Sequence, residues 1–290
     1  MEMDFGQLQL FSQPNDMLTQ GYEQLSSFKF DEAEFIFGQI DRSFNDHGAD
    51  TDKALLSAAY WKTVFSRLES ILDSEKIFYL YNQLNRFEFS NDWGDQKLWS
   101  SLISFITGLM IEQGVFYINQ EIAMSDLLLQ IGKRQMAEQS LTAHISSSPI
   151  DTPARFRLAQ LQWKQKQKGA ALQNYTLGLL LNPENVPFNY LECDKTQSLI
   201  QNHEIEMVPG YGWIAGILPL MAVPDNVIPL NEKHGSALEC YRLLRAAEKA
   251  SKKQDIEATV NYRKALKAGW PTLYDEYYAL ISKRVQPSFY

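Results

Sequence analysis

Cysteine and histidine are scarce in this chain of 290 residues, which has two cysteines and four histidines. Cys193 and Cys240 lack the spacing of a metal site, and two isolated thiols are typical of a reducing compartment, with one disulfide between them as the alternative. No two histidines have the i, i+4 spacing of a zinc-binding helix. We therefore expect reduced thiols, no metal and no other cofactor.

Long apolar runs and a secretory signal are also missing. The longest apolar stretch, Val208 to Val223, is too short to cross a bilayer and is interrupted by prolines and glycines. The acidic start, Met1 to Phe5, lacks the basic region and apolar run of a signal peptide. We expect a cytoplasmic protein without a membrane span.

The usual catalytic motifs are absent. The sequence contains no glycine-rich phosphate loop and no Gly-x-Ser-x-Gly nucleophile elbow. His203, Glu204 and Glu206 lie close together, but a zinc-protease helix needs a second histidine where Met207 stands. A non-enzyme is therefore the first prediction. An enzyme with its site in the Pro/Gly-rich segment 186–235 is the alternative.

Charge is unevenly distributed along the chain. The net charge is -8, which disfavours a general nucleic-acid binder. Residues 1–120 carry 18 acidic and 8 basic side chains, whereas residues 234–284 carry 10 basic and 6 acidic ones. The C-terminal cations could contact an acidic partner or the acidic end of a second copy, or could simply be solvated helix faces. The residues of this cluster are Arg242, Arg245, Lys249, Lys252 and Lys253.

Apolar residues recur at spacings of three and four over most of the chain, which predicts helices, and no alternating run indicates a strand. The expected helices are Asp16 to Ser27, Asp31 to Asn45, Asp52 to Leu72, Ser74 to Phe87, Gln96 to Gln113, Asn119 to Ile131, Lys133 to Ser146, Pro153 to Lys166, Lys168 to Leu181, Ala237 to Ser251, Asp255 to Ala268 and Thr272 to Lys283. The fold class is therefore all-α.

One segment interrupts this pattern. Six of the eleven prolines and four glycines lie between Pro183 and Gly235, so long helices cannot form there. A short helix from Cys193 to Asn202 is compatible with it. We expect a helical array over residues 1–185, an irregular apolar connection over 186–235 and a C-terminal helical unit over 236–290. Tyr211 and Trp213 in the connection could hold the C-terminal unit on the array or bind a partner.

An internal repeat is the most specific signal in the sequence. A pattern of three positions recurs 34 residues later in the chain: small, large apolar and proline at Ala137, Leu141 and Pro149, and again at Ala171, Tyr175 and Pro183. In the second copy, small residues stand where paired helices would touch, and Tyr175 would fill the space beside them. These small residues are Ala159, Ala171 and Gly178.

This pattern resembles the tetratricopeptide repeat, a 34-residue helix-turn-helix unit. The resemblance extends to a third copy and to a looser fourth copy and covers about 140 residues, while the region Thr51 to Gly114 departs from it. The third copy has Gly21, Ala33, Phe37 and Ile40 near the N-terminus, and the looser copy has Ala246, Ala258, Tyr262 and Ala265 near the C-terminus, where Pro271 comes one residue late. The resemblance implies helical hairpins stacked into a right-handed array.

The resemblance also implies a binding module, in which the first helices of the hairpins line a groove for a peptide or helix. The residues at groove positions are Leu18, Tyr22, Leu25, Ile122, Asp126, Leu129, Phe156, Gln160, Trp163 and Lys164. Phe156 and Gln160 replace the Lys and Asn with which some family members bind a C-terminal carboxylate. We expect a scaffold or adaptor that binds another protein or itself. A carbohydrate-binding surface protein with similar repeats is a further alternative.

Overall fold

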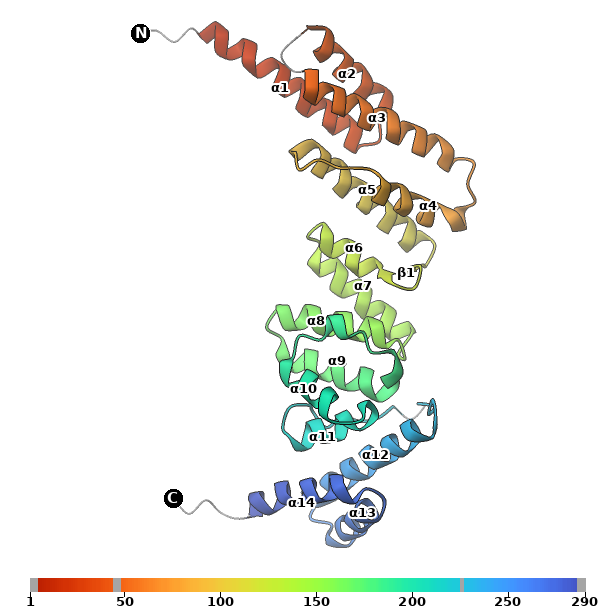
Figure 1. Cartoon of the computed structure of the whole chain (residues 1–290), viewed down its shortest axis with the longest axis vertical. Coiled ribbons are helices and arrows are strands. Elements are labelled where there is room, and N and C mark those ends of the chain that lie inside the picture. The colour runs from red at the N-terminus through yellow and green to blue at the C-terminus, as the bar shows by residue number, and fades with distance from the viewer. Residues whose placement is uncertain (1–4, 44–47, 225–226, 286–290) are drawn as a thin grey trace. The chain divides into compact units, whose positions relative to one another are not determined.

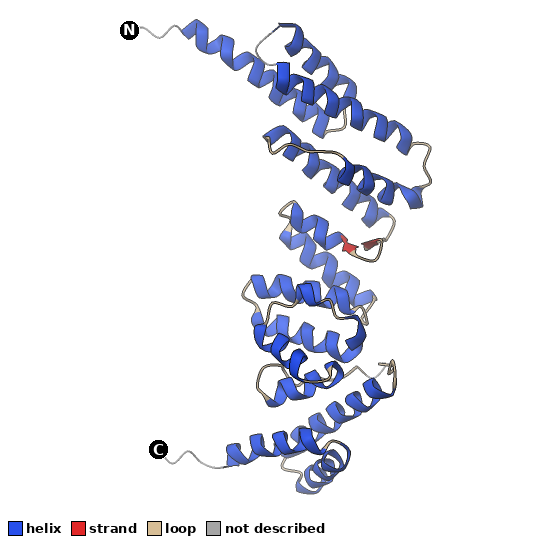
Figure 2. Ribbon diagram, viewed as in Figure 1, coloured by secondary structure: helices blue, strands red, loops and turns tan. Residues whose placement is uncertain are grey.

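A computed structural model gives the fold and describes residues 5–43, 48–224 and 227–285. The described part is almost entirely helical, which confirms the all-α class (Figures 1 and 2). Its exception is a short antiparallel hairpin of β1 (Tyr117–Ile118) and β2 (Ile122–Ala123). Asn119 and Gln120 form the turn of this hairpin with positive φ angles, so the helix expected from Asn119 begins only at Met124.

The chain divides into two compact units, residues 1–137 (unit 1) and 138–290 (unit 2). The division falls within α7 (Arg134–Ser147), whereas the sequence placed a boundary at residue 185. The expected connection belongs to unit 2, because Val186, Leu191, Val208 and Leu218 share one core with α8 and α9.

Unit 1 is built from helices that pack against their neighbours in the chain, and α1 also contacts α5. The helices are α1 (Phe5–Ser26), α2 (Phe30–Ser43), α3 (Gly48–Leu68), α4 (Asp73–Arg86), α5 (Trp93–Glu112) and α6 (Met124–Gln130). The region Thr51 to Gly114, which departs from the repeat pattern, contributes to the core of unit 1. Trp61 of α3 and Leu98 and Leu102 of α5 are fully buried.

Unit 2 contains two long helical hairpins joined by the Pro/Gly-rich connection, drawn in teal in Figure 1. The hairpins are α8 (Thr152–Lys164) with α9 (Lys168–Leu181), and α12 (Glu232–Lys252) with α13 (Ile256–Gly269), followed by α14 (Pro271–Val285). The connection holds η2 (Pro183–Asn185), η3 (Phe188–Tyr190), α10 (Asp194–Asn202), η4 (Ile205–Met207) and α11 (Val208–Ile214). The short helices agree with the expectation that no long helix forms there.

A common turn closes four of the helical hairpins. Phe28, Gly132, Lys166 and Gln254 each have a φ angle of 60–74°. In every case the amide of this residue donates to the carbonyl three residues earlier, and the next amide donates to the carbonyl five residues before it. Gly132 and Lys166 are 34 residues apart. The hairpin therefore recurs as a local structural unit.

The small residues expected at the helix crossing of the α8–α9 hairpin are confirmed. Ala159 and Ala171 are fully buried, and Tyr175 beside them has no exposed surface. A Cβ atom on Gly178 would lie 2.7 Å from Cε2 of Phe156. Similarly, a Cβ atom on Gly21 would lie 2.3 Å from the Phe37 ring.

The C-terminal hairpin has a register one residue later than expected. Ala247 and Leu266 are fully buried and Thr259 is nearly so, whereas Ala265 is exposed. The reason lies in the turn, because Gln254 follows Lys166 by 88 residues and places each buried position one residue further along. Pro271, which is one residue late in the sequence pattern, begins α14 in agreement with this register.

Candidate functional site

The groove positions of α8 are covered by the chain itself. Phe156 is completely buried, and the side chain of Gln160 donates to Glu192 at 2.7 Å. Lys164 forms an ion pair with the same carboxylate at 3.3 Å. Trp163 packs against the core that contains the connection. This face of α8 therefore holds residues of the connection, whose η3 contacts α8 (Figure 1).

Tyr175 fixes the connection in this position. Its hydroxyl donates to the carbonyl of Tyr190 at 2.8 Å and accepts from the amide of Glu192 at 3.1 Å. Burial raises the pKa of Tyr175 to about 12. The phenol therefore stays neutral at physiological pH and keeps its donor.

The remaining groove positions have mixed surroundings. Leu25 is fully buried, whereas Leu18 and Tyr22 line a small pocket in unit 1. The other three groove positions of unit 1 lie near the hairpin and α6. Ile122 lies in β2, Asp126 accepts from the amide of Ala123 at the start of α6, and Leu129 is half-buried. Of the ten residues, Leu25 and Phe156 are thus fully buried within their own units.

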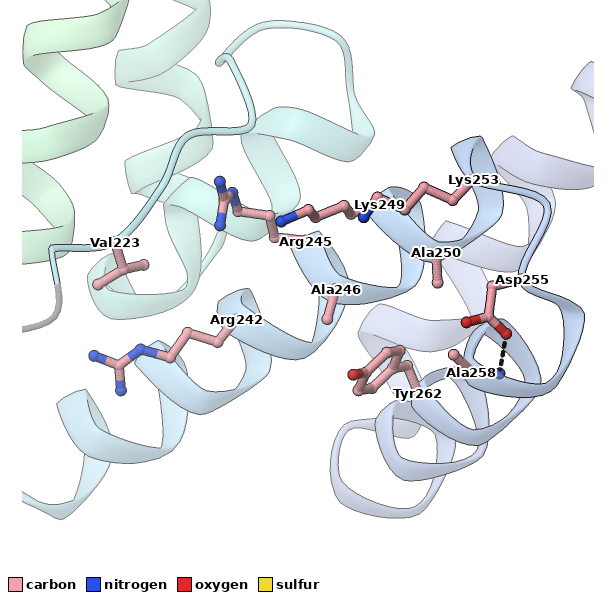
Figure 3. A pocket seen from close by; sticks show the side chains of 10 residues that line it. All are labelled: Val223, Arg242, Arg245, Ala246, Lys249, Ala250, Lys253, Asp255, Ala258 and Tyr262. Carbon is pink, nitrogen blue, oxygen red and sulfur yellow. Dashed lines mark hydrogen bonds between the residues drawn. The ribbon is translucent and has the colours of Figure 1, made fainter.

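The basic cluster, by contrast, lies along an open groove between α12 and α13. Arg242, Arg245, Lys249 and Lys253 follow one another at spacings of three and four, so they share one face of α12. Figure 3 shows the four side chains extending along this helix. Lys252 is exposed but does not line the groove.

The floor of this groove is partly apolar and made of small side chains. The groove has a volume of about 430 Å³, and Ala246, Ala250 and Ala258 lie between the two helices. Tyr262 of α13, whose exposed fraction is 37%, and Val223 of the connection complete the lining (Figure 3). We call these residues and the four cations the basic groove.

The electrostatics of the basic groove are one-sided. Its single acidic lining residue, Asp255, accepts from the amide of Ala258 at 3.0 Å and caps the start of α13. Within the described part of the chain, none of the four cations forms an ion pair with a carboxylate. Like charges four residues apart on a helix, such as Arg245 and Lys249, repel each other. An anionic group in the groove would relieve that repulsion.

The turn register relates this face of α12 to α8. The positions equivalent to Ala246 and Lys249 are Leu158 and Leu161, which are both buried. Arg245 is equivalent to Arg157, which is also buried, so the same helix face is covered in the first hairpin and open in the second. The cations of this site could be recognised in the sequence. Tyr262 was not recognised as an exposed residue, because the sequence pattern placed it one residue out of register, at the position of the buried Tyr175.

Two residues of the alternative enzymatic site contact neighbouring side chains. The ring of His203 stacks on Tyr211 at 3.9 Å, and Glu204 forms an ion pair with Lys233 at 3.7 Å. Among the described residues, which exclude His47, no group of His, Cys, Asp and Glu could hold a metal ion. Cys193 and Cys240 are free and buried.

The segment around Tyr211 and Trp213 joins two cores. Tyr211 packs against both the α8–α9 core and the core of α12 to α14. The ring of Trp213 lies 6.0 Å from that of Tyr277 in α14. This arrangement agrees with the interpretation that the segment holds the C-terminal helices in place.

Comparisons of the chain with protein-family models, with curated proteins and with solved structures find no match. In the described residues, no helix is both long and apolar enough to cross a membrane. The function therefore has to be inferred from the geometry and charge of the basic groove.

Proposed function

We propose that this protein is an interaction module, a scaffold or adaptor, whose basic groove binds an acidic segment of a partner protein. The observation that carries the proposal is the row of four unpaired cations beside an apolar floor. Side chains such as Tyr262 and the alanines supply contact area, and the cations select for negative charge.

The helix dipole explains part of this charge distribution but not all of it. Lys249 and Lys252 lie in the last turn of α12, where the C-terminal end of a helix favours cations. Arg245 and Arg242 lie about one and two turns before Lys249, outside the last turn in which that effect acts. Their placement along the groove is better explained by a ligand.

The array interpretation supports the same role. The recurring turn and the small residues at the helix crossings are what a tetratricopeptide-like array requires, and such arrays are binding modules. A right-handed stacking of the hairpins remains part of this proposal. A partner with a carboxylate-rich helix or extended segment would suit the groove.

The test is the affinity for a fluorescein-labelled peptide of glutamate, alanine and leucine, measured by anisotropy at low and high salt. We expect Arg245→Gln and Lys249→Gln each to weaken binding roughly 2- to 5-fold, since an exposed ion pair contributes about 0.2–1 kcal/mol. Asp255→Asn should strengthen binding, because asparagine keeps the helix cap and removes the repelling charge.

Lys252→Gln is the matched control, because it removes one positive charge from the same helix outside the groove. Equal losses for Lys252→Gln and Lys249→Gln would show that only overall charge matters and would contradict the proposal. Tighter binding of a labelled single-stranded DNA than of the peptide would assign the groove to nucleic acid instead.

A further inference from the structure

Unit 1 contains a second pocket with the opposite charge. It has a volume of about 200 Å³ and lies between the end of α1, the start of α3 and the start of α5. Its lining, which we call the acidic pocket, consists of Leu18, Thr19, Tyr22, Asp50, Asp92, Trp93 and Gly94. The pocket is smaller than the roughly 300–1,000 Å³ that drug-sized ligands need, so it suits a single side chain or small head group.

Two carboxylates give this pocket its charge. Asp92 caps α5 by accepting from the amide of Asp95 at 2.8 Å, and its other oxygen accepts from the hydroxyl of Ser90. Asp50 forms no hydrogen bond or ion pair in the described part of the chain. The charge of Asp50 is therefore free to meet a cation.

A buried phenol adds an independent indication of a ligand. Tyr22 is only 5% exposed, yet its hydroxyl has no hydrogen-bond partner among the described residues. Burial raises the pKa of Tyr22 above its usual range, and the nearby Asp92, Asp95 and Asp50 raise it further. Tyr22 lines the same pocket as Asp50 and Asp92, where a donor group of a ligand could pair with its hydroxyl.

The position of this phenol is fixed by close packing. A Cβ atom on Gly94 would lie 2.4 Å from the Tyr22 ring, so only glycine allows the ring to approach this backbone. The ring also makes edge contacts with Phe37 at 5.3 Å and with Trp93 at 6.4 Å. The Tyr22 ring is thus held in place in the lining of the acidic pocket.

An aromatic wall completes the acidic pocket. The indole of Trp93 is 54% exposed, and the ammonium group of Lys97 already lies 4.8 Å from the centre of its ring. Glu23 holds that ammonium group at 3.3 Å. Lys97 thus shows that this ring accepts a cation on one face, and a ligand cation would contact the other face.

We propose that the acidic pocket binds the guanidinium or ammonium group of an arginine or lysine side chain from a partner protein. The carboxylate of Asp50 would pair with the charge, Trp93 would contribute a cation–π contact, and the Tyr22 hydroxyl would accept a hydrogen bond. This site lies in unit 1 and does not depend on the basic groove of unit 2. It would give the protein a second contact, selective for the opposite charge.

The test uses protein labelled with ¹⁵N at its tryptophans, with the Trp93 indole signal assigned by its loss in Trp93→Phe. N-acetyl-arginine-amide is added as the probe, and N-acetyl-citrulline-amide serves as its uncharged isostere. We expect a saturable shift of the Trp93 signal with the arginine compound only. Asp50→Asn should weaken this binding about tenfold, as followed by the same Trp93 signal.

Asp52→Asn is the matched control, because Asp52 is exposed on the same helix and does not line the pocket. Equal shifts with citrulline, no saturation, or the same affinity in the Asp50→Asn and Asp52→Asn variants would overturn the proposal. A response to spermidine without one to the arginine compound would overturn the assignment to a protein side chain.

Discussion

At the scale of single residues, glycine at a helix crossing sets how closely two helices approach. Gly178 of α9 faces Phe156 of α8 at a distance that leaves no room for a methyl group, whereas Gly169 in the same helix has open space around it. Both positions are helical, so alanine would improve the helix propensity at each by about 1 kcal/mol. Packing alone therefore decides the sign of the effect.

We expect Gly178→Ala to lower the free energy of unfolding by up to about 2 kcal/mol, because overpacking costs about 1–3 kcal/mol and the propensity gain offsets about 1 kcal/mol of it. Gly169→Ala should raise it by up to about 1 kcal/mol. Urea denaturation followed by circular dichroism measures both. A stabilised Gly178→Ala variant would mean that the hairpin can open without cost.

At the scale of elements, the common hairpin turn holds its central residue in the left-handed region. Glycine occupies this position as Gly132, but Lys166 and Gln254 occupy it in unit 2. A residue with a Cβ atom is strained there by about 1–2 kcal/mol, while glycine costs more unfolded-state entropy. The two effects leave a net advantage for glycine.

The turn therefore predicts opposite results for two substitutions. Lys166→Gly should raise the free energy of unfolding by roughly 0.5–1 kcal/mol, and Gly132→Ala should lower it by at least as much. Lys264→Gly is the control, since it places the same residue inside α13, where glycine destabilises. A destabilised Lys166→Gly variant would show that the strain at this position is already relieved by its surroundings.

The elements also show how far the sequence determines the structure. The period of 3.6 and the residues Ala159, Ala171 and Gly178 predict the α8–α9 hairpin, since each position is fixed by a local packing requirement. The register of α13 could not be predicted in this way. It depends on which residue of the turn adopts a positive φ angle, and Gln254 gives no signal in its side chain.

The candidate site was predictable in its charge but not in its shape. Arg242, Arg245 and Lys249 stand out in the sequence as a basic cluster, yet whether they line a groove depends on the packing of α13. The acidic pocket combines residues from three helices. The sequence predicts Leu18 and Tyr22 as groove positions of a repeat array, not as residues of an acidic pocket. Asp50 and Trp93 lie too far along the chain for any local pattern to connect them with α1.

At the scale of the whole molecule, the buried phenols of unit 2 make stability depend on alkaline pH. Burial raises the pKa of Tyr175, Tyr241 and Tyr277 to about 12, compared with an ordinary value of 10.0. It likewise raises the pKa of the Cys240 thiol to about 12, compared with 9.0. These groups remain protonated in the folded chain at a pH where the unfolded chain has lost its protons.

The sign of the effect follows from this difference. Below the unfolded pKa values both states are protonated, and the contribution of these groups to stability is complete. As the pH rises toward about 12, the unfolded state releases protons that the folded state keeps, so the free energy of unfolding falls. Each phenol contributes a slope of about 1.4 kcal/mol per pH unit within this window.

We therefore expect urea denaturation midpoints to stay constant near neutral pH and to fall steeply above pH ~10. Between pH ~10 and about 12, phenolate absorbance of the buried tyrosines should appear together with the loss of helical circular dichroism, because these phenols ionise there in the unfolded chain and not in the folded one. Tyr241→Phe should lower stability at neutral pH, since Tyr241 bonds the amide of Met221 at 2.8 Å, but it should also reduce the alkaline slope by one proton. An unchanged slope in this variant would mean that Tyr241 ionises in the folded chain, and that the core around α9 and α12 admits water.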